Sequence, residues 1–243
     1  MKLRHQLGLA IVALIGAGAE KAESARTSVA RDFPIYDNGG KPDLTIDPVR
    51  FENQMEIIDR YFDPIADACV FEEFAVGGPG YRRLLRFDTV ILNSGDADLV
   101  VGDRSDPENP YADWFYFAAC HGHYHIRDFA LYELIKTDGS KSVVVKGEKQ
   151  GFCMEDSFKY DGNKSGGYDC ENQGITSGFG DWYYKQLAGQ WIDITGVPEG
   201  DYIVRATINK AGTFDEGSNT YPNSVERTIH VPDPRIKVDG SWH

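Results

Sequence analysis

A short run of the chain places three histidines at every second position. His121, His123 and His125 belong to this run, and the 243-residue sequence has six histidines in all. Side chains at alternate positions of an extended strand share one face, so the run predicts three imidazoles that point the same way. Imidazole is a good ligand for zinc, copper, iron and nickel. The spacing therefore predicts a transition-metal site.

Strand geometry sets a condition on this site. In a flat strand that rises about 3.3 Å per residue, the Cα atoms of His121 and His125 would lie about 13 Å apart. One metal needs each ring nitrogen within about 2.0–2.1 Å, so we expect a twist or bulge that lets the outer rings lean inward. The simplest competing interpretation is a polar strand face that carries three solvated histidines.

Composition and charge narrow the class of protein. The net charge of −13 argues against a nucleic-acid partner, because nucleic-acid-binding domains are basic. A hydrophobic content of 41% is enough for a real core, and 26 glycines with 11 prolines indicate many turns. The sequence predicts an acidic globular protein that is rich in loops.

The first 19 residues have the pattern of a secretory signal. Lys2 and Arg4 precede an apolar run at 7–17, and residues 17–19 read Ala-Gly-Ala, which is a small-residue cleavage site. The apolar run is too short to anchor the chain in a membrane. Removal of this segment would take the net charge from −13 to −15, since it contains two basic and no acidic residues.

The expected organisation follows from this signal. We expect a signal peptide at 1–19, a mobile leader at 20–41, one domain at 42–233 and a tail at 234–243. The protein would be secreted or periplasmic, without a membrane span.

An even number of cysteines indicates disulfides in an exported protein. They are Cys69, Cys120, Cys153 and Cys170. None of their spacings is the C-x-x-C pair of a zinc site, so we expect two disulfides, with three pairings open. Cys120 directly precedes His121, and a bridge there would hold the histidine strand in place.

The rest of the chain predicts short strands and turns. A proline-flanked edge strand is expected at 42–48, and a buried strand or a hairpin at 82–93. Residues 129–135 and 141–146 flank a Thr-Asp-Gly-Ser turn and predict a hairpin. Residues 51–74 suggest one helical turn or irregular structure. We expect a mainly β fold: an antiparallel sandwich or open barrel in a single domain, with long loops and little helix.

Several ordered motifs resemble the catalytic domain of the lysyl oxidase family. They are CHGHYH (120–125), FALYELI (129–135), KGEKQGFCMED (146–156), QGITSGFGDWYY (173–184) and QWIDITGVPEGDYIV (190–204), with RRLLRF (82–87) and LNSGDADLVVG (92–102) upstream. The resemblance covers roughly residues 42–231. Several motifs in a consistent order are more specific than any one of them.

The resemblance implies a copper site and one of the disulfides. The family binds copper through its H-x-H-x-H histidines, which are His121, His123 and His125 here. The family's bridge from the cysteine before these histidines implies a Cys120–Cys170 pair. Cys69 and Cys153 would then be left to pair with each other.

The family also builds a lysine tyrosylquinone cofactor from one lysine and one tyrosine. The lysine lies three residues before Phe152, which implies Lys149. The tyrosine lies eight residues before Trp191, which implies Tyr183, and Tyr184 would replace it if the loop alignment slipped by one residue.

One departure from the family concerns the catalytic base. Animal members carry a histidine directly before a tyrosine in the stretch after the copper ligands, whereas Leu131 precedes Tyr132 here. Another group must then accept the proton. The candidates are Asp128, Asp156 and Asp181. We favour Asp181, because it lies two residues before Tyr183.

The resemblance implies oxidation of primary amines by dioxygen, giving aldehydes, ammonia and hydrogen peroxide. Lysine side chains, polyamines and small alkylamines all fit, and an acidic protein attracts such cations at long range. Two other functions remain open. One is a secreted module that binds copper or zinc without forming a quinone. The other is a zinc- or iron-dependent hydrolase or oxygenase that uses three histidines and an open position.

Overall fold

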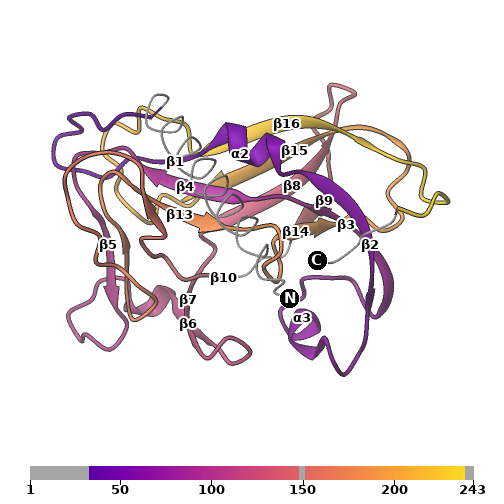
Figure 1. Ribbon diagram of the computed structural model, residues 1–243, viewed down its shortest axis with the longest axis horizontal. Coiled ribbons are helices and arrows are strands. Elements are labelled where there is room, and N and C mark those ends of the chain that lie inside the picture. Colours follow the sequence, from indigo (N-terminus) through magenta and orange to yellow (C-terminus); the bar gives the residue numbers. More distant parts are fainter. Residues whose placement is uncertain (1–32, 148–150, 239–243) are drawn as a thin grey trace, which may run out of the picture.

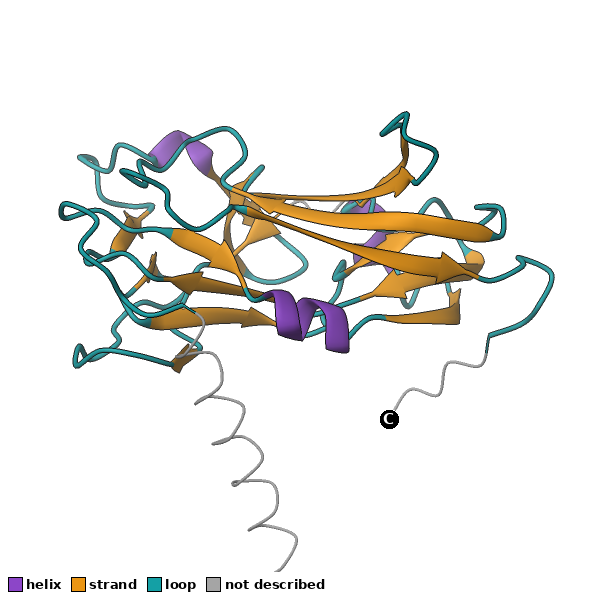
Figure 2. Cartoon of the chain, turned by 90° about the horizontal axis from the view of Figure 1, so that it is seen from above, coloured by secondary structure: helices purple, strands orange, loops and turns teal. Residues whose placement is uncertain are grey.

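A computed structural model of the chain describes residues 33–147 and 151–238. This part is mainly β, with antiparallel sheets and little helix, and its strands do not close into a barrel. Figures 1 and 2 show strands filling the body of the molecule, while the helices are short. The fold class predicted from the sequence is confirmed.

The described strands form five antiparallel sheets. One four-stranded sheet has the order β1 (Leu44–Ile46), β4 (Thr89–Asn93), β13 (Phe179–Tyr183) and β11 (Phe158–Lys159). The second four-stranded sheet has the order β16 (Ser224–Val231), β15 (Gly200–Ile208), β8 (Ala130–Lys136) and β9 (Val143–Gly147). One three-stranded sheet has the order β14 (Trp191–Asp193), β3 (Gly80–Arg86) and β2 (Glu56–Phe62). The second three-stranded sheet has the order β10 (Gly151–Phe152), β7 (His123–Arg127) and β6 (Phe115–Ala118). The two-stranded sheet pairs β12 (Asn172–Ile175) with β5 (Leu99–Asp103). The helices are α2 (Pro48–Asn53), α3 (Ala68–Glu72) and the 3-10 turn η1 (Ala112–Trp114).

Alternating burial along β15 shows how the core is built. Tyr202, Val204, Ala206 and Ile208 are buried, and the residues between them are more exposed. This period of two is that of a strand with one face on the core. A fully buried valine or isoleucine contributes roughly 1.5–3 kcal/mol relative to an exposed one.

Strand β4 anchors the part of the core nearest the candidate site. All five of its residues are buried. It pairs with β13 so that Asp181 lies opposite Ile91 and Tyr183 opposite Thr89. Two residues of predicted function therefore stand on a strand that the core holds rigidly.

Some local predictions are confirmed and others are wrong. The edge strand at 42–48 is β1, and the hairpin at 129–146 is β8 paired with β9. Residues 82–93 form neither one strand nor a hairpin, since β3 and β4 belong to different sheets. The stretch 51–74, predicted as one helical turn or irregular structure, contains the short helix α3, but it also contains the strand β2, which pairs with β3.

Both ends of the described chain pack against the domain. In the stretch expected to be a leader, Asn38 is buried, and its amide donates to the carbonyls of Pro42 and Glu216. Near the other end, the amide N–H of Val238 donates to Asp59. None of the described helices has the length and apolar character needed to cross a bilayer.

The disulfide pairing differs from the one that the resemblance implied. Cys69 pairs with Cys120 and Cys153 with Cys170, at Cα–Cα separations of 5.6 and 5.2 Å. Such separations are typical of disulfides. The predicted Cys120–Cys170 and Cys69–Cys153 pairs are wrong, because the fold brings helix α3 beside the hairpin of β6 and β7.

Candidate active site

The histidine run is a turn followed by a strand. His123 and His125 belong to β7, whereas His121 lies in the preceding turn, where its amide N–H and that of Gly122 donate to the carbonyl of Ala118. Gly122 has a φ of +74°, which a residue with a side chain rarely adopts. The expected single strand is therefore wrong at His121. The turn removes the problem of distance by folding His121 back toward the other two rings.

The three imidazoles converge. One ring nitrogen from each of His121, His123 and His125 lies within 4.8 Å of the others. The Nε2 atoms of His123 and His125 are 2.9 Å apart. Two nitrogens bound about 2.05 Å from one metal at about 90° would be about 2.9 Å apart, so this pair fits a shared ion. Burial, and then the nearby His121, lower the pKa of His123, which favours the neutral imidazole that binds metals.

Two residues that the sequence did not single out support His125. The Tyr116 hydroxyl lies 3.3 Å from Nδ1 of His125, on the side of the ring away from His123. A Cβ atom at Gly151 would lie 2.5 Å from both Cβ and Nδ1 of His125, so only glycine fits there. Burial, and then the charge of Glu73, raise the pKa of Tyr116 to about 12, which keeps its hydroxyl protonated.

Tyr183 occupies a buried position behind this cluster. Its hydroxyl donates to the carbonyl oxygen of Cys153 and has a second hydrogen-bond partner in Asp181. The ring of Phe152 packs edge-on against it at a centroid distance of 4.7 Å. Burial, and then the adjacent Asp181, raise the pKa of Tyr183 well above its usual range. By contrast, Tyr184 is exposed and stacks on Trp182.

Asp181 is a carboxyl group removed from solvent. Only 2% of its surface is exposed, and the Ser157 hydroxyl donates to it at 3.1 Å. Burial raises its pKa well above the usual range, and the charge of Glu155 adds to this effect. A buried carboxyl with a raised pKa can hold or accept a proton near neutral pH.

The disulfide Cys153–Cys170 connects the histidines to Tyr183. Both sulfur atoms and a ring nitrogen of His123 lie within 4.8 Å of one another. The carbonyl of Cys153 is in turn the acceptor for the Tyr183 hydroxyl. Strand β10 reinforces the connection, because Gly151 contacts His125 and the next residue, Phe152, contacts Tyr183.

Comparison with known proteins identifies the family of the chain. A model of the lysyl oxidase family matches residues 69–240. The chain belongs to the lysyl oxidase family. It is 39% identical over 194 residues to lysyl oxidase homolog 2 of Homo sapiens, covering 76% of this chain and 24% of that protein. The corresponding bovine protein (Bos taurus) is 38% identical over 209 residues, covering 82% and 25%. The mouse protein (Mus musculus) is 41% identical over 196 residues, covering 76% and 24%. The matched region is thus about a quarter of each relative's length.

Lys149, to which the family resemblance assigned the cofactor lysine, lies outside the described residues. It precedes Gly151 by two positions in the sequence. The part of the chain described after Lys149 begins with β10. This strand lies between the histidine cluster, which Gly151 approaches, and Tyr183, against which Phe152 packs.

The other candidate bases have different surroundings in this family member. Asp156 accepts hydrogen bonds from the backbone N–H and the hydroxyl of Thr176, at 2.8 and 2.7 Å, and so holds a loop together. Asp128 is exposed, in a turn with a φ of 53°. Among the three predicted carboxylates, Asp181 is the one that contacts Tyr183.

Two cavities differ in whether a residue of the histidine cluster lines them. One, of about 420 Å³, is lined by His123, by the aromatic rings of Phe117 and Tyr124, and by the carboxylates of Asp103 and Glu171. The cavity therefore borders the histidine cluster at His123.

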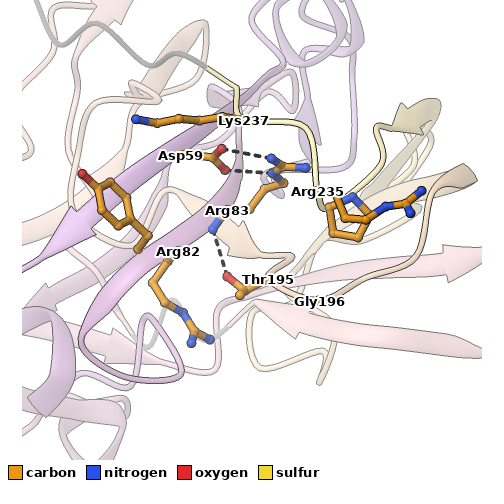
Figure 3. A pocket seen from close by; sticks show the side chains of 9 residues that line it. Asp59, Arg82, Arg83, Thr195, Gly196, Arg235 and Lys237 are labelled. Carbon is orange, nitrogen blue, oxygen red and sulfur yellow. Dashed lines mark hydrogen bonds and ion pairs between the residues drawn. The ribbon is translucent and has the colours of Figure 1, made fainter.

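The other cavity, of about 390 Å³, lies between β2, β3 and the C-terminal segment (Figure 3). No residue of the histidine cluster lines it. Two of its basic side chains are paired with carboxylates, Arg83 with Asp59 and Arg82 with Asp193. We therefore assign it no part in the candidate site.

Proposed function

We propose that this protein is a copper-dependent amine oxidase of the lysyl oxidase type. It oxidises primary amines with dioxygen to aldehydes, releasing ammonia and hydrogen peroxide. The observation that carries the proposal is the convergence of three imidazoles within 4.8 Å, next to the disulfide whose Cys153 carbonyl binds Tyr183. The cofactor is a lysine tyrosylquinone formed from Lys149 and Tyr183.

His121, His123 and His125 hold the copper ion. The close approach of two Nε2 atoms, the lowered pKa of His123 and the glycine packed against His125 all support this role. When bound, the copper ion and the quinone supply the redox chemistry. The protein supplies ligands, position and a proton acceptor.

Asp181 acts as the proton acceptor for the amine substrate. Its carboxylate takes a proton from the carbon next to the amine, and burial raises its pKa well above the usual range, which makes it a stronger base than an exposed carboxylate. Its contact with Tyr183 supports this assignment, because the amine must react beside that ring. The surrounding core, including Phe152, keeps water away from the reacting groups.

The substrate is a cationic amine. The cavity beside His123 is lined by two carboxylates, Asp103 and Glu171, by one cation, Arg104, and by aromatic rings, so its acidic side chains outnumber its basic one. Hydrogen bonds from the backbone and hydroxyl of Ser105 lower the pKa of Asp103, so that it carries a negative charge at neutral pH. A protonated amine is attracted to such a rim before it loses its proton and reacts. The signal pattern at 1–19 and the two disulfides support secretion.

Replacement of Lys149 tests the proposal. The protein is reconstituted with copper in air, and amine-dependent hydrogen peroxide and phenylhydrazine labelling are measured. Lys149→Arg should bind copper yet lose both signals, because the guanidinium stays protonated and cannot add to the ring of Tyr183 after dioxygen has oxidised it. The matched control is Lys146→Arg, an exposed lysine three residues earlier, which should behave as wild type.

Two outcomes would contradict the proposal. Peroxide release by Lys149→Arg at the wild-type rate would reject the cofactor lysine. Wild-type protein that binds copper but neither releases peroxide nor reacts with phenylhydrazine would favour a metal-binding module without catalysis.

A further inference from the structure

A carboxylate from another part of the chain contacts the histidine cluster. Oε1 of Glu73 lies 3.0 Å from Nε2 of His121, and the two side chains are 21% and 29% exposed. Glu73 follows the last residue of α3, where its backbone N–H donates to the carbonyls of Cys69 and Phe71. It is a fixed helix-end residue and not part of a free loop.

The first disulfide holds this carboxylate in place. Cys69 precedes Glu73 by four residues, and Cys120 directly precedes His121. Residues four apart in a helix lie on the same face, so the Cys69–Cys120 bond draws Glu73 toward the turn that carries His121. The neighbouring acid, Glu72, instead faces the disulfide, with its Oε2 3.5 Å from Sγ of Cys120.

The geometry separates two roles for Glu73. The ring nitrogens of His121, His123 and His125 lie within 4.8 Å of one another. Among residues 33–147 and 151–238, no carboxylate belongs to this group of potential ligand atoms. Glu73 is thus placed outside the ligand set, against one nitrogen of one ring. A metal-bound histidine commonly donates its other ring N–H to a carboxylate, which fixes the orientation of the ring.

We propose that Glu73 is a positioning residue of the metal centre. It accepts a hydrogen bond from Nε2–H of His121, which leaves Nδ1 of that ring for the metal, and the Cys69–Cys120 disulfide fixes the distance. This inference rests on the copper site of the proposed function. It adds Glu73, which precedes His121 by 48 positions in the sequence and fixes the orientation of its ring.

Copper affinity and the Cu(II) electron paramagnetic resonance spectrum of three variants test this inference. Glu73→Ala should lose about 10–100-fold in copper affinity, measured by chelator competition, because His121 is no longer held. Glu73→Gln should lose less, since its amide oxygen still accepts the hydrogen bond, and should keep the wild-type nitrogen coupling. Glu72→Gln changes the charge equally one residue away and should leave affinity and spectrum unchanged.

Three results would overturn the inference. The first is wild-type affinity in Glu73→Ala. The second is a loss of copper affinity in Glu73→Gln that equals the loss in Glu73→Ala, with an altered resonance spectrum in Glu73→Gln. That result would make Glu73 a direct ligand. The third is an equal loss in Glu72→Gln, which would make the effect one of general charge.

Wild-type behaviour separates this inference from the proposed function. If the wild type binds copper and forms the quinone while the Glu73 variants match it, only the positioning role fails. If the wild type binds no copper, both fail. Thermal unfolding of the metal-free variants checks that each affinity change belongs to the site, because a folded apoprotein with the wild-type midpoint still has its histidines in place.

Discussion

Removal of each disulfide should cost a different and calculable amount of stability. A disulfide stabilises a protein mainly by restricting the unfolded chain, and the effect grows with the length of the closed loop. The Cys153–Cys170 pair spans 17 residues of sequence and the Cys69–Cys120 pair spans 51. With these lengths, the loop-entropy relation gives about 3 kcal/mol for the first bond and about 4 kcal/mol for the second at 25 °C.

The assay is urea unfolding of the metal-free protein. The variant with Cys153→Ala and Cys170→Ala should lose about 3 kcal/mol in free energy of unfolding, and the variant with Cys69→Ala and Cys120→Ala about 4 kcal/mol. Metal-free protein is used because a metal bound to the native state would add its own stabilisation. An order of losses opposite to the loop lengths would contradict the entropic reasoning.

A crossed pair of substitutions tests the pairing itself. Cys120→Ala with Cys170→Ala removes one partner from each bond, so Cys69 and Cys153 should remain as two thiols that react with a thiol reagent after unfolding. The pairing implied by the family resemblance predicts no reactive thiol in this variant, because Cys69 and Cys153 would be bonded to each other. Absence of thiols would therefore refute the disulfides described above.

Three further substitutions probe the histidines and the base. His123→Ala should remove most bound copper, measured by metal analysis after dialysis; stoichiometric copper in this variant would exclude the site. Gly151→Ala should weaken copper binding, since its Cβ would lie 2.5 Å from His125, and an unchanged affinity would show that this strand does not constrain the ring. Asp181→Asn should lower kcat by about 10²–10⁴-fold and remove the acid limb of the pH profile, because activity rises as pH passes upward through the raised pKa of this carboxyl. Between the ordinary carboxyl pKa and the raised pKa of Asp181, the native protein holds a proton on this carboxyl that the unfolded chain has lost. The free energy of unfolding therefore falls as pH rises through that window. Asp181→Asn should flatten this pH dependence in unfolding measurements.

Local patterns predicted much of the fold. The Thr-Asp-Gly-Ser turn signal located the β8–β9 hairpin, and flanking prolines located β1. The H-x-H-x-H spacing predicted that His121, His123 and His125 converge, although it placed all three on one strand. The turn at Gly122 was the missing element, and its positive φ depends on the chain before and after it.

Contacts between distant segments could not be predicted in the same way. Residues 69 and 120 meet because α3 lies beside the turn between β6 and β7, and no local pattern encodes that contact. The same fold brings Glu73 to His121. Gly151 gave one signal that could have been used, since a glycine two residues after the proposed cofactor lysine suggests a close approach of the backbone to the site.

The central claim is that Lys149 and Tyr183 form one cofactor beside the copper ion. Peptide mass mapping of protein reconstituted with copper in air tests it most directly, because it detects the bond itself and not its consequences. The account predicts a covalently linked pair of peptides that contain Lys149 and Tyr183, absent from protein kept without copper and absent from Tyr183→Phe. Separate, unmodified Lys149 and Tyr183 peptides from copper-loaded protein that is active on amines would contradict it.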